Sequence, residues 1–168
     1  YEHLPTLYRY AKESESFLEC GIRGCVSSWA ISKGICENNR KNKKLYFNDI
    51  NEVDINTLEK CLSMVNVPYE LLWCNDLDVN IKNVDSIFID TFHVYGHLSR
   101  ELDKFSKITN KWILIHDTAV DKINGEALRC NMNIDVLKKN TGYTDFEIKN
   151  GMEMALKEFL DKNDEWFI

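Results

Sequence analysis

Along the chain, short apolar runs alternate with longer stretches in which apolar residues recur every three or four positions. The short runs predict buried β-strands, and the longer stretches predict amphipathic helices. The predicted strands cover residues 16–20, 44–49, 69–74, 85–90 and 111–117, and a sixth begins at 165–168. Because strands that are apolar on both faces alternate with helices, we expect an α/β fold with a mostly parallel sheet and helices on both faces.

The helix boundaries follow from proline, glycine and capping residues. Pro5 suits the first turn of a helix, and Gly34 predicts the end of a helix over 25–33. Asp54 predicts the start of another helix, which Pro68 closes. Apolar stripes mark four helices by the sets Leu4, Leu7, Tyr8 and Ala11; Leu58, Cys61, Leu62 and Val65; Tyr95, Leu98, Leu102 and Phe105; and Met152, Leu156, Phe159 and Leu160. Residues 119–150 are less readable.

Length and charge narrow the class of protein. The chain has 168 residues, the size of one domain, with 44% hydrophobic and 29% charged residues, as in globular proteins. Its net charge of −6 argues against nucleic acid or an anionic membrane as a partner, but permits a small anionic or zwitterionic ligand bound by backbone amides. No apolar stretch is long enough to span a membrane and no signal peptide opens the chain, so we expect a cytoplasmic protein.

The cysteines do not form a recognisable framework. Most of them fall inside apolar runs, and no C-x-x-C pair is present. We interpret them as reduced core residues rather than as disulfides or zinc ligands. They are Cys20, Cys25, Cys36, Cys61, Cys74 and Cys130.

Residues that can carry chemistry lie at the carboxyl end of every predicted strand. In a doubly wound sheet the carboxyl ends of the strands form the ligand crevice. The residues are Glu19, Gly21 and Gly24 at the first strand, Asp49 at the second, Asp76 at the third, Asp90 and His93 at the fourth, and His116 and Asp117 at the fifth. Each has an ordinary structural alternative, such as a turn glycine, a helix-capping aspartate or a surface histidine. Their coincidence at one edge favours a binding site.

Two segments resemble a known family. The segment FLECGIRGCVSSW, residues 17–29, looks like the first motif of the class I S-adenosylmethionine-dependent methyltransferases. IDTFHVYGHL followed by WILIHDT is similar to the I-D-x-x-H-x-Y … I-x-x-H-D-T pattern of one branch. This branch includes macrolide-sugar O-methyltransferases and cephalosporin-hydroxylase-like proteins. The resemblance covers residues 17–118, and more faintly extends to 163, and it implies a Rossmann-like sheet with strand order 3-2-1-4-5.

The resemblance implies a binding site for the methyl donor. Gly21 and Gly24 would let the backbone approach the methionine portion, and Glu19 would accept from the turn or from the donor's ammonium group. Asp49 would hold the ribose hydroxyls, and Asp76 would meet the adenine amino group. Asp90 would border both the donor site and the catalytic site.

The same resemblance implies a catalytic base and a metal. His93 occupies the slot of the general base, which would deprotonate the acceptor hydroxyl. Relatives hold a divalent cation between the Asp that ends strand four and an acidic pair that ends strand five. Asp90 and Asp117 match, but His116 replaces the first acid of the pair. Imidazole is a poor ligand for Mg²⁺. Three alternatives stay open for the cation, Mg²⁺ or Mn²⁺: it changes identity, it loses one ligand, or it is absent.

The chain end differs from the family. Members normally finish with a sixth strand and an antiparallel seventh strand, whereas here the sequence stops at Ile168. We therefore expect residues 1–168 to be one methyltransferase-like domain that lacks the final β-hairpin. Since the first residue is Tyr1 rather than Met, we also expect a longer parent chain, with a homo-oligomer or further domains left open.

Three functions are weighed. The first is a methyltransferase acting on a hydroxyl of a sugar, glycan or other small acceptor. The second is a catalytically silent methyltransferase-like binding module of a larger protein. The third, a nicotinamide-dependent oxidoreductase, is disfavoured because the glycine turn lacks a third glycine.

Overall fold

The computed structural model describes residues 2–168 and divides the chain into two compact units. The first, which we call the sheet unit, contains the chain up to Asp90 together with Lys107–Leu114. The second, the helical unit, contains Thr91–Ser106 and Ile115–Ile168. Each unit is described by itself.

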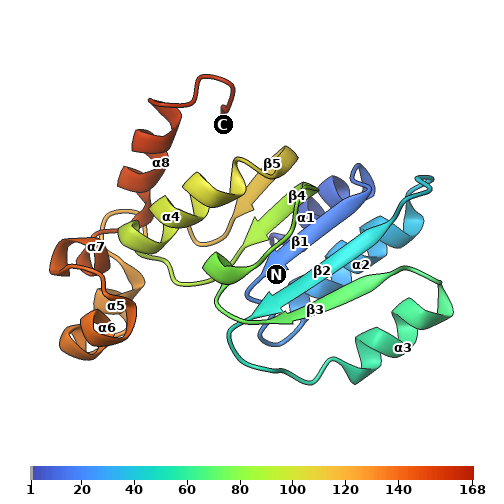
Figure 1. Ribbon diagram of the computed structural model, residues 1–168, viewed down its shortest axis with the longest axis horizontal. Coiled ribbons are helices and arrows are strands. Elements are labelled where there is room, and N and C mark those ends of the chain that lie inside the picture. Colours follow the sequence, from blue (N-terminus) through green and yellow to red (C-terminus); the bar gives the residue numbers. More distant parts are fainter. Residues whose placement is uncertain (1) are drawn as a thin grey trace. The chain divides into compact units, whose positions relative to one another are not determined.

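Within residues 2–168 the strands form a five-stranded sheet in the order β3-β2-β1-β4-β5, which confirms the predicted fold class and strand order (Figure 1). Strand β1 pairs in parallel with β2 and with β4, and β2 pairs in parallel with β3. The register places Phe17 opposite both Leu45 and Ser86. The strands are β1 (Ser16–Cys20), β2 (Lys44–Asp49), β3 (Tyr69–Trp73), β4 (Val84–Ile89) and β5 (Thr109–Ile115).

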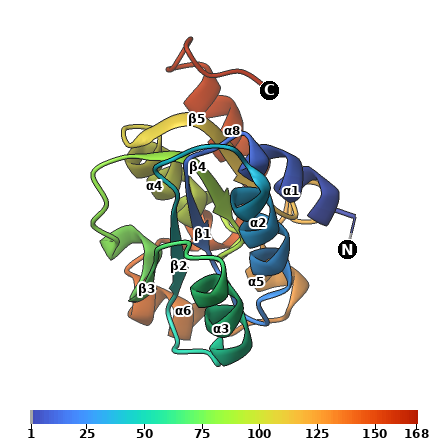
Figure 2. The same cartoon turned by 90° about the vertical axis from the view of Figure 1, so that its right-hand side faces the viewer.

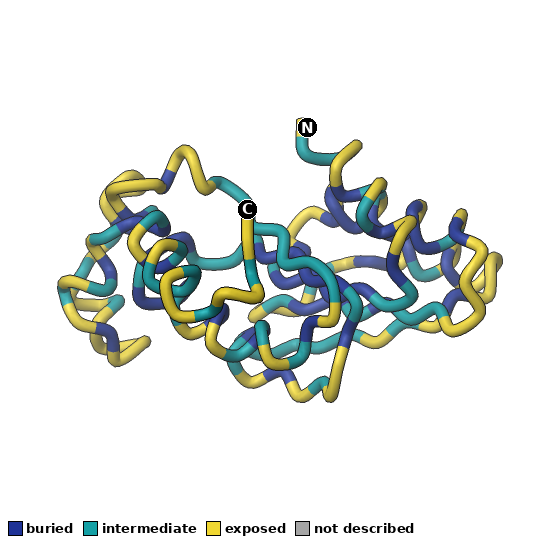
Figure 3. Tube along the Cα trace, turned by 90° about the horizontal axis from the view of Figure 1, so that it is seen from above, coloured by how far each residue is buried: buried dark blue, intermediate teal, exposed yellow. Residues whose placement is uncertain are grey.

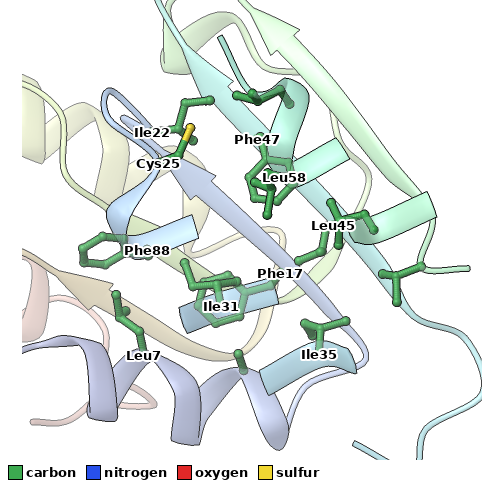
Figure 4. Close-up of a cluster of buried hydrophobic side chains, with 14 residues drawn as sticks. Leu7, Phe17, Ile22, Cys25, Ile31, Ile35, Leu45, Phe47, Leu58 and Phe88 are labelled. Atoms are coloured by element: carbon green, nitrogen blue, oxygen red, sulfur yellow. The ribbon is translucent and has the colours of Figure 1, made fainter. Parts of the chain in front are cut away.

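Three helices of the sheet unit lie on one face of the sheet (Figure 2). They are α1 (Leu4–Lys12), α2 (Val26–Glu37) and α3 (Asn56–Met64), and a 3₁₀ turn, η1 (Asp76–Asp78), follows β3. Figure 4 shows the core of this unit, in which Phe17 and Phe47 from the strands meet Ile31 and Leu58 from the helices. Burial of this apolar surface is the main force that holds the helices on the sheet.

Gly34 does not end a helix, contrary to the sequence prediction. It lies inside α2, where a Cβ would sit 2.5 Å from the carbonyl oxygen of Tyr8 and 2.7 Å from the Cβ of Ala11. The glycine therefore lets α2 pack directly against the backbone of α1. The contact partner lies far away in the sequence, so a local pattern could not distinguish this role from a helix end.

The helical unit is built from α4 (Tyr95–Phe105), α5 (Glu126–Arg129), α6 (Ile134–Thr141), α7 (Asp145–Lys149) and α8 (Met152–Leu160). The predicted stripe of α4 is confirmed by the burial of Leu98, Leu102 and Phe105. A small apolar cluster joins residues 119–150, the stretch without a clear pattern in the sequence, to the start of α4. Its buried members are Val94, Ala127, Tyr143 and Ile148.

The predicted sixth strand at 165–168 is wrong. No strand is assigned to these described residues, and Phe167 is 90% exposed. Figure 3 draws the C-terminal end of the chain in the colour of exposed residues. The chain instead turns after α8, because the Trp166 N–H donates to the carbonyl of Asn163 and the Trp166 ring packs 6.1 Å from the ring of Phe159. A β-propensity run without a neighbouring strand has no hydrogen-bond ladder to join.

Two further corrections concern exposure and strand ends. Cys61 and Cys130 are exposed rather than in the core, although all six cysteines are free thiols. Strand β5 ends at Ile115, so His116 and Asp117 lie beyond it.

Among the helices of residues 2–168, none has the length and apolar character needed to cross a bilayer.

Candidate functional site

The glycine turn after β1 lies directly against the end of β2. Gly21 has a φ of 89°, in the left-handed region that favours glycine, and its N–H donates to the carbonyl of Asn48 at 2.8 Å. Ile22 and Cys25 anchor the turn because both side chains belong to the core cluster (Figure 4). A Cβ on Gly24 would meet no atom within 4 Å, so the structure leaves open space there.

The carboxylate of Asp49 connects the two loops at this edge. Its Oδ2 accepts from the backbone N–H of Arg23 at 3.0 Å, and its Oδ1 accepts from the N–H of Asn51 at 3.0 Å. A carboxylate oxygen has two lone pairs, so each oxygen can accept one more hydrogen bond. The structure therefore brings Gly21 and Asp49 together, and the Asp49 carboxylate can accept two further hydrogen bonds.

Glu19 lies underneath the turn rather than on its surface. Its side chain is fully buried and accepts a hydrogen bond from the hydroxyl of Ser27 in α2, while Oε2 has no hydrogen-bond partner among residues 2–168. Burial raises the pKa of Glu19 to about 7, because the ionised form loses its hydration there. The hydrogen bond to Glu19 thus comes from the first turn of α2 and not from the glycine turn.

The other two carboxylates that the sequence predicted for the site, Asp76 and Asp90, follow β3 and β4. Asp90 comes directly after β4, is half-buried, and donates its N–H to the carbonyl of Cys20 at 2.9 Å, which places it beside the end of β1. Asp76 begins η1 and is buried. Gly21, Asp49 and Asp90 therefore share one edge of the sheet.

In the helical unit, His93 lies buried next to two carboxylates. Its Nδ1 is 3.3 Å from Oδ2 of Asp121 and 3.8 Å from Oδ2 of Asp117. Asp121 is fully buried and receives two hydrogen bonds from Arg129, from Nε at 2.7 Å and from Nη2 at 2.8 Å. These bonds to Asp121 raise the pKa of the Arg129 guanidinium above its usual value.

His116 and Asp117 lie in the turn that follows β5, because the strand ends at Ile115. Asp117 has a φ of 49°, and its carbonyl accepts from Val120 and Asp121 to form a turn. Its side chain faces two imidazoles, with Oδ1 3.2 Å from Nδ1 of His116 and Oδ2 toward His93. His116 is half-buried, and its ring centroid is 6.2 Å from that of His93.

The residues predicted to hold a metal fit some cations better than others. His116 and Asp117 offer one imidazole nitrogen and one carboxylate oxygen from adjacent positions. This mixture suits Mn²⁺ or Zn²⁺ better than Mg²⁺, which prefers oxygen ligands. Ligand atoms of His93, Asp117 and Asp121 lie within 4.8 Å of one another, but the Arg129 cation already neutralises Asp121. Asp90 belongs to the sheet unit.

Sequence reasoning missed Asp121, Glu126 and Arg129. All three lie in the stretch without readable periodicity, and each contacts His93 or its partner. The spacing of Glu126 and Arg129 is the i, i+3 spacing of a helix pair, and these side chains do approach to 3.8 Å. Nothing in that spacing indicated a histidine about thirty residues upstream.

No protein-family model matches the chain, and no curated protein matches it. Solved structures do match, and two of them are described. One is a Klebsiella pneumoniae protein with a provisional assignment as an O-methyltransferase, at 14% identity and a TM-score of 0.54, covering 98% of this chain and 67% of that one. The other is the O-methyltransferase TomG of Streptomyces achromogenes, involved in tomaymycin synthesis and solved with S-adenosylmethionine, at 13% identity and a TM-score of 0.55, covering 99% of this chain and 69% of that one. This chain therefore has the fold of these O-methyltransferases.

Proposed function

We propose that the chain is an S-adenosylmethionine-dependent methyltransferase that acts on a hydroxyl of a sugar or another small acceptor. The observation that carries the proposal is the pairing of the Gly21 turn with Asp49 at the carboxyl edge of a β3-β2-β1-β4-β5 sheet. The fold shared with an O-methyltransferase solved with S-adenosylmethionine supports the same donor.

In the proposed donor site, the positive φ at Gly21 and the open space at Gly24 admit the methionine portion. The two carboxylate oxygens of Asp49 accept from the ribose hydroxyls, since each has one acceptor position left. Asp76 is assigned to the adenine amino group, and Asp90 to the border with the acceptor. Glu19 supports the turn from below through Ser27.

In the proposed reaction, His93 takes the proton of the acceptor hydroxyl. The acceptor oxygen forms a bond to the methyl carbon as the bond from that carbon to the sulfonium sulfur breaks, and the electron pair of the broken bond stays on sulfur. The products are a methyl ether, S-adenosylhomocysteine and a proton that His93 later releases. Burial of His93 beside Asp121 supports this role, because a base must be held in one orientation to act.

A divalent cation is the open part of the proposal. His116, Asp117 and Asp90 are the candidate ligands. Such an ion would stabilise the negative charge that develops on the acceptor oxygen as its proton leaves. The donor set favours Mn²⁺ or Zn²⁺ over Mg²⁺.

Calorimetric titration tests the proposal. S-adenosylhomocysteine and NAD are each titrated into the protein, with and without Mg²⁺ or Mn²⁺. We expect S-adenosylhomocysteine to bind and NAD to give no heat. A second assay incubates S-adenosylmethionine with a panel of glycosides and follows the release of S-adenosylhomocysteine. Binding without turnover on any acceptor would favour the silent binding module, and binding of NAD alone would refute the donor assignment.

A further inference from the structure

The short helix α5 holds His93 by its backbone as well as by its ring. The His93 N–H donates to Oε2 of Glu126 at 3.3 Å, and the His93 carbonyl accepts from the Glu126 N–H at 2.9 Å. One turn later on α5, Arg129 forms its two hydrogen bonds to Asp121, which faces the His93 ring. A four-residue helix thus contacts the histidine along two routes.

The position of Asp121 is set by two further contacts. Its N–H donates to the Asp117 carbonyl at 3.0 Å, and its own carbonyl accepts from the N–H of Met152 at the start of α8 at 2.9 Å. A Cβ on Gly151 would lie 2.3 Å from that same Asp121 carbonyl, so a glycine is needed at this close approach. The backbone of Asp121 is therefore held by Asp117 and Met152, and its carboxylate is held by Arg129.

The chemistry of this chain decides which ring nitrogen of His93 carries the proton. Arginine has only donors and an ionised carboxylate has only acceptors, so Arg129 keeps Asp121 as an acceptor for His93. Nδ1, which lies 3.3 Å from Oδ2 of Asp121, must then donate. In the neutral imidazole Nε2 consequently carries the lone pair.

We propose that Asp121 and Arg129 are positioning residues that fix His93 as its Nδ1–H tautomer and direct Nε2 to serve as the base. The catalytic consequence rests on the proposed function, whereas the tautomer is a property of the chain itself. Asp121 acts through orientation rather than through net charge, because Arg129 neutralises it.

Removing the carboxylate gives a sharp expectation. Asp121→Ala takes away the acceptor that lies 3.3 Å from Nδ1, so the Nδ1–H form should lose its advantage and the Nε2–H form should rise. Asp121→Asn would not discriminate, because Arg129 bonds to both carboxylate oxygens and the amide oxygen could still face His93. Arg129→Met removes the two hydrogen bonds that orient Asp121, so it should lower the Nδ1–H population in part.

Long-range ¹H–¹⁵N correlation spectra of histidine-labelled protein test this proposal without any acceptor. The chain has four histidines, so His93→Gln assigns the signal. At about pH 8.5, above the ordinary histidine pKa, we expect Nδ1–H in the wild type, mainly Nε2–H in Asp121→Ala, and a mixture of the two tautomers in Arg129→Met. The control is Arg100→Met, which removes an arginine of similar exposure, 43% against 41%, that pairs with Glu147 instead. It should leave the His93 spectrum unchanged.

Two results would overturn the proposal. One is an Nε2–H tautomer in the wild type, which decides the matter even if Asp121→Ala does not fold. The other is a folded Asp121→Ala protein with the wild-type spectrum. Where an acceptor has been found, Asp121→Ala should lower kcat by about 10²-fold or more, with the acceptor KM and the affinity for S-adenosylhomocysteine within twofold of wild type. Loss of donor affinity instead would indicate a merely structural role. A wild type that methylates nothing would refute the proposed function and leave the tautomer result standing.

Discussion

The backbone N–H of Arg23 donates to Oδ2 of Asp49 at 3.0 Å, which ties the turn after β1 to the end of β2. One carboxylate thus organises the turn and retains acceptor positions for a ligand. This dual use means that the effect of losing Asp49 on ligand affinity must be separated from its effect on the turn.

We expect Asp49→Ala to weaken binding of S-adenosylhomocysteine by about 1.5–3 kcal/mol, the scale of a hydrogen bond to a charged group. Titration calorimetry measures the change. Asp54→Ala is the matched control, because Asp54 also accepts a backbone N–H, that of Asn56 at 3.0 Å, at the start of α3. Unchanged affinity in Asp49→Ala would mean that the ribose is held elsewhere.

Gly21→Ala should destabilise the fold by about 1–2 kcal/mol, the cost of a left-handed φ for a residue with a Cβ, and should abolish S-adenosylhomocysteine binding. Gly142→Ala is the control, since Gly142 has a φ of 74° with no atom within 4 Å of its Cβ position. We expect the control to lose similar stability in urea denaturation and to keep its affinity. Equal loss of affinity in both variants would contradict a donor site at Gly21.

Gly34→Ala should lower the free energy of unfolding by about 1–3 kcal/mol, the range for overpacking. The added methyl group would meet the Tyr8 carbonyl oxygen and the Cβ of Ala11, and neither atom can move away without separating α1 from α2. Lys33→Ala, on the exposed side of the same helix, should change stability by less than about 0.5 kcal/mol. A stable Gly34→Ala protein would show that the two helices can shift apart at little cost.

Glu19 should make the protein less stable as the pH rises. Its folded-state pKa of about 7 exceeds the ordinary value of 4.5 that holds in the unfolded chain, so the folded chain binds the proton more tightly. The resulting stabilisation is complete below about 4.5 and is lost as the pH approaches 7. It amounts to a magnitude on the order of 3 kcal/mol.

Glu19→Gln keeps the shape of the neutral carboxyl and cannot ionise, so this part of the pH dependence should disappear. Urea denaturation at pH 5 and at pH 8 measures it, with Glu70→Gln as the exposed control on β3. An unchanged pH dependence in Glu19→Gln would show that Glu19 does not hold its proton in the folded state.

His93→Ala should abolish methyl transfer and spare S-adenosylhomocysteine binding, because the donor-binding residues belong to the sheet unit. Release of S-adenosylhomocysteine measures transfer, and His3→Ala serves as the control. A wild-type rate in His93→Ala would rule out His93 as the base.

Chelator treatment followed by the same assay tests the cation separately, and full activity after chelation would contradict a metal at His116 and Asp117.

The sequence predicted the sheet and the residues at its carboxyl edge. β1 and β2 have the predicted bounds, and the five strands have the predicted order. Buried parallel strands require continuous apolar runs, and such runs are local. Once the strands are parallel, their carboxyl ends must meet at one edge, so Gly21, Asp49 and Asp90 could be grouped without knowledge of any contact.

Only the tertiary structure decided how His93 is held and what Gly34 does. Asp121 and Arg129 reach His93 from a stretch of short helices whose individual turns leave little periodicity to detect. Gly34 is a glycine because Tyr8 and Ala11 lie against it. The end of β5 at Ile115, which leaves His116 and Asp117 outside the strand, depends on the turn that begins at Asp117. Periodicity records which face of an element is buried, whereas these features depend on which distant residue arrives there.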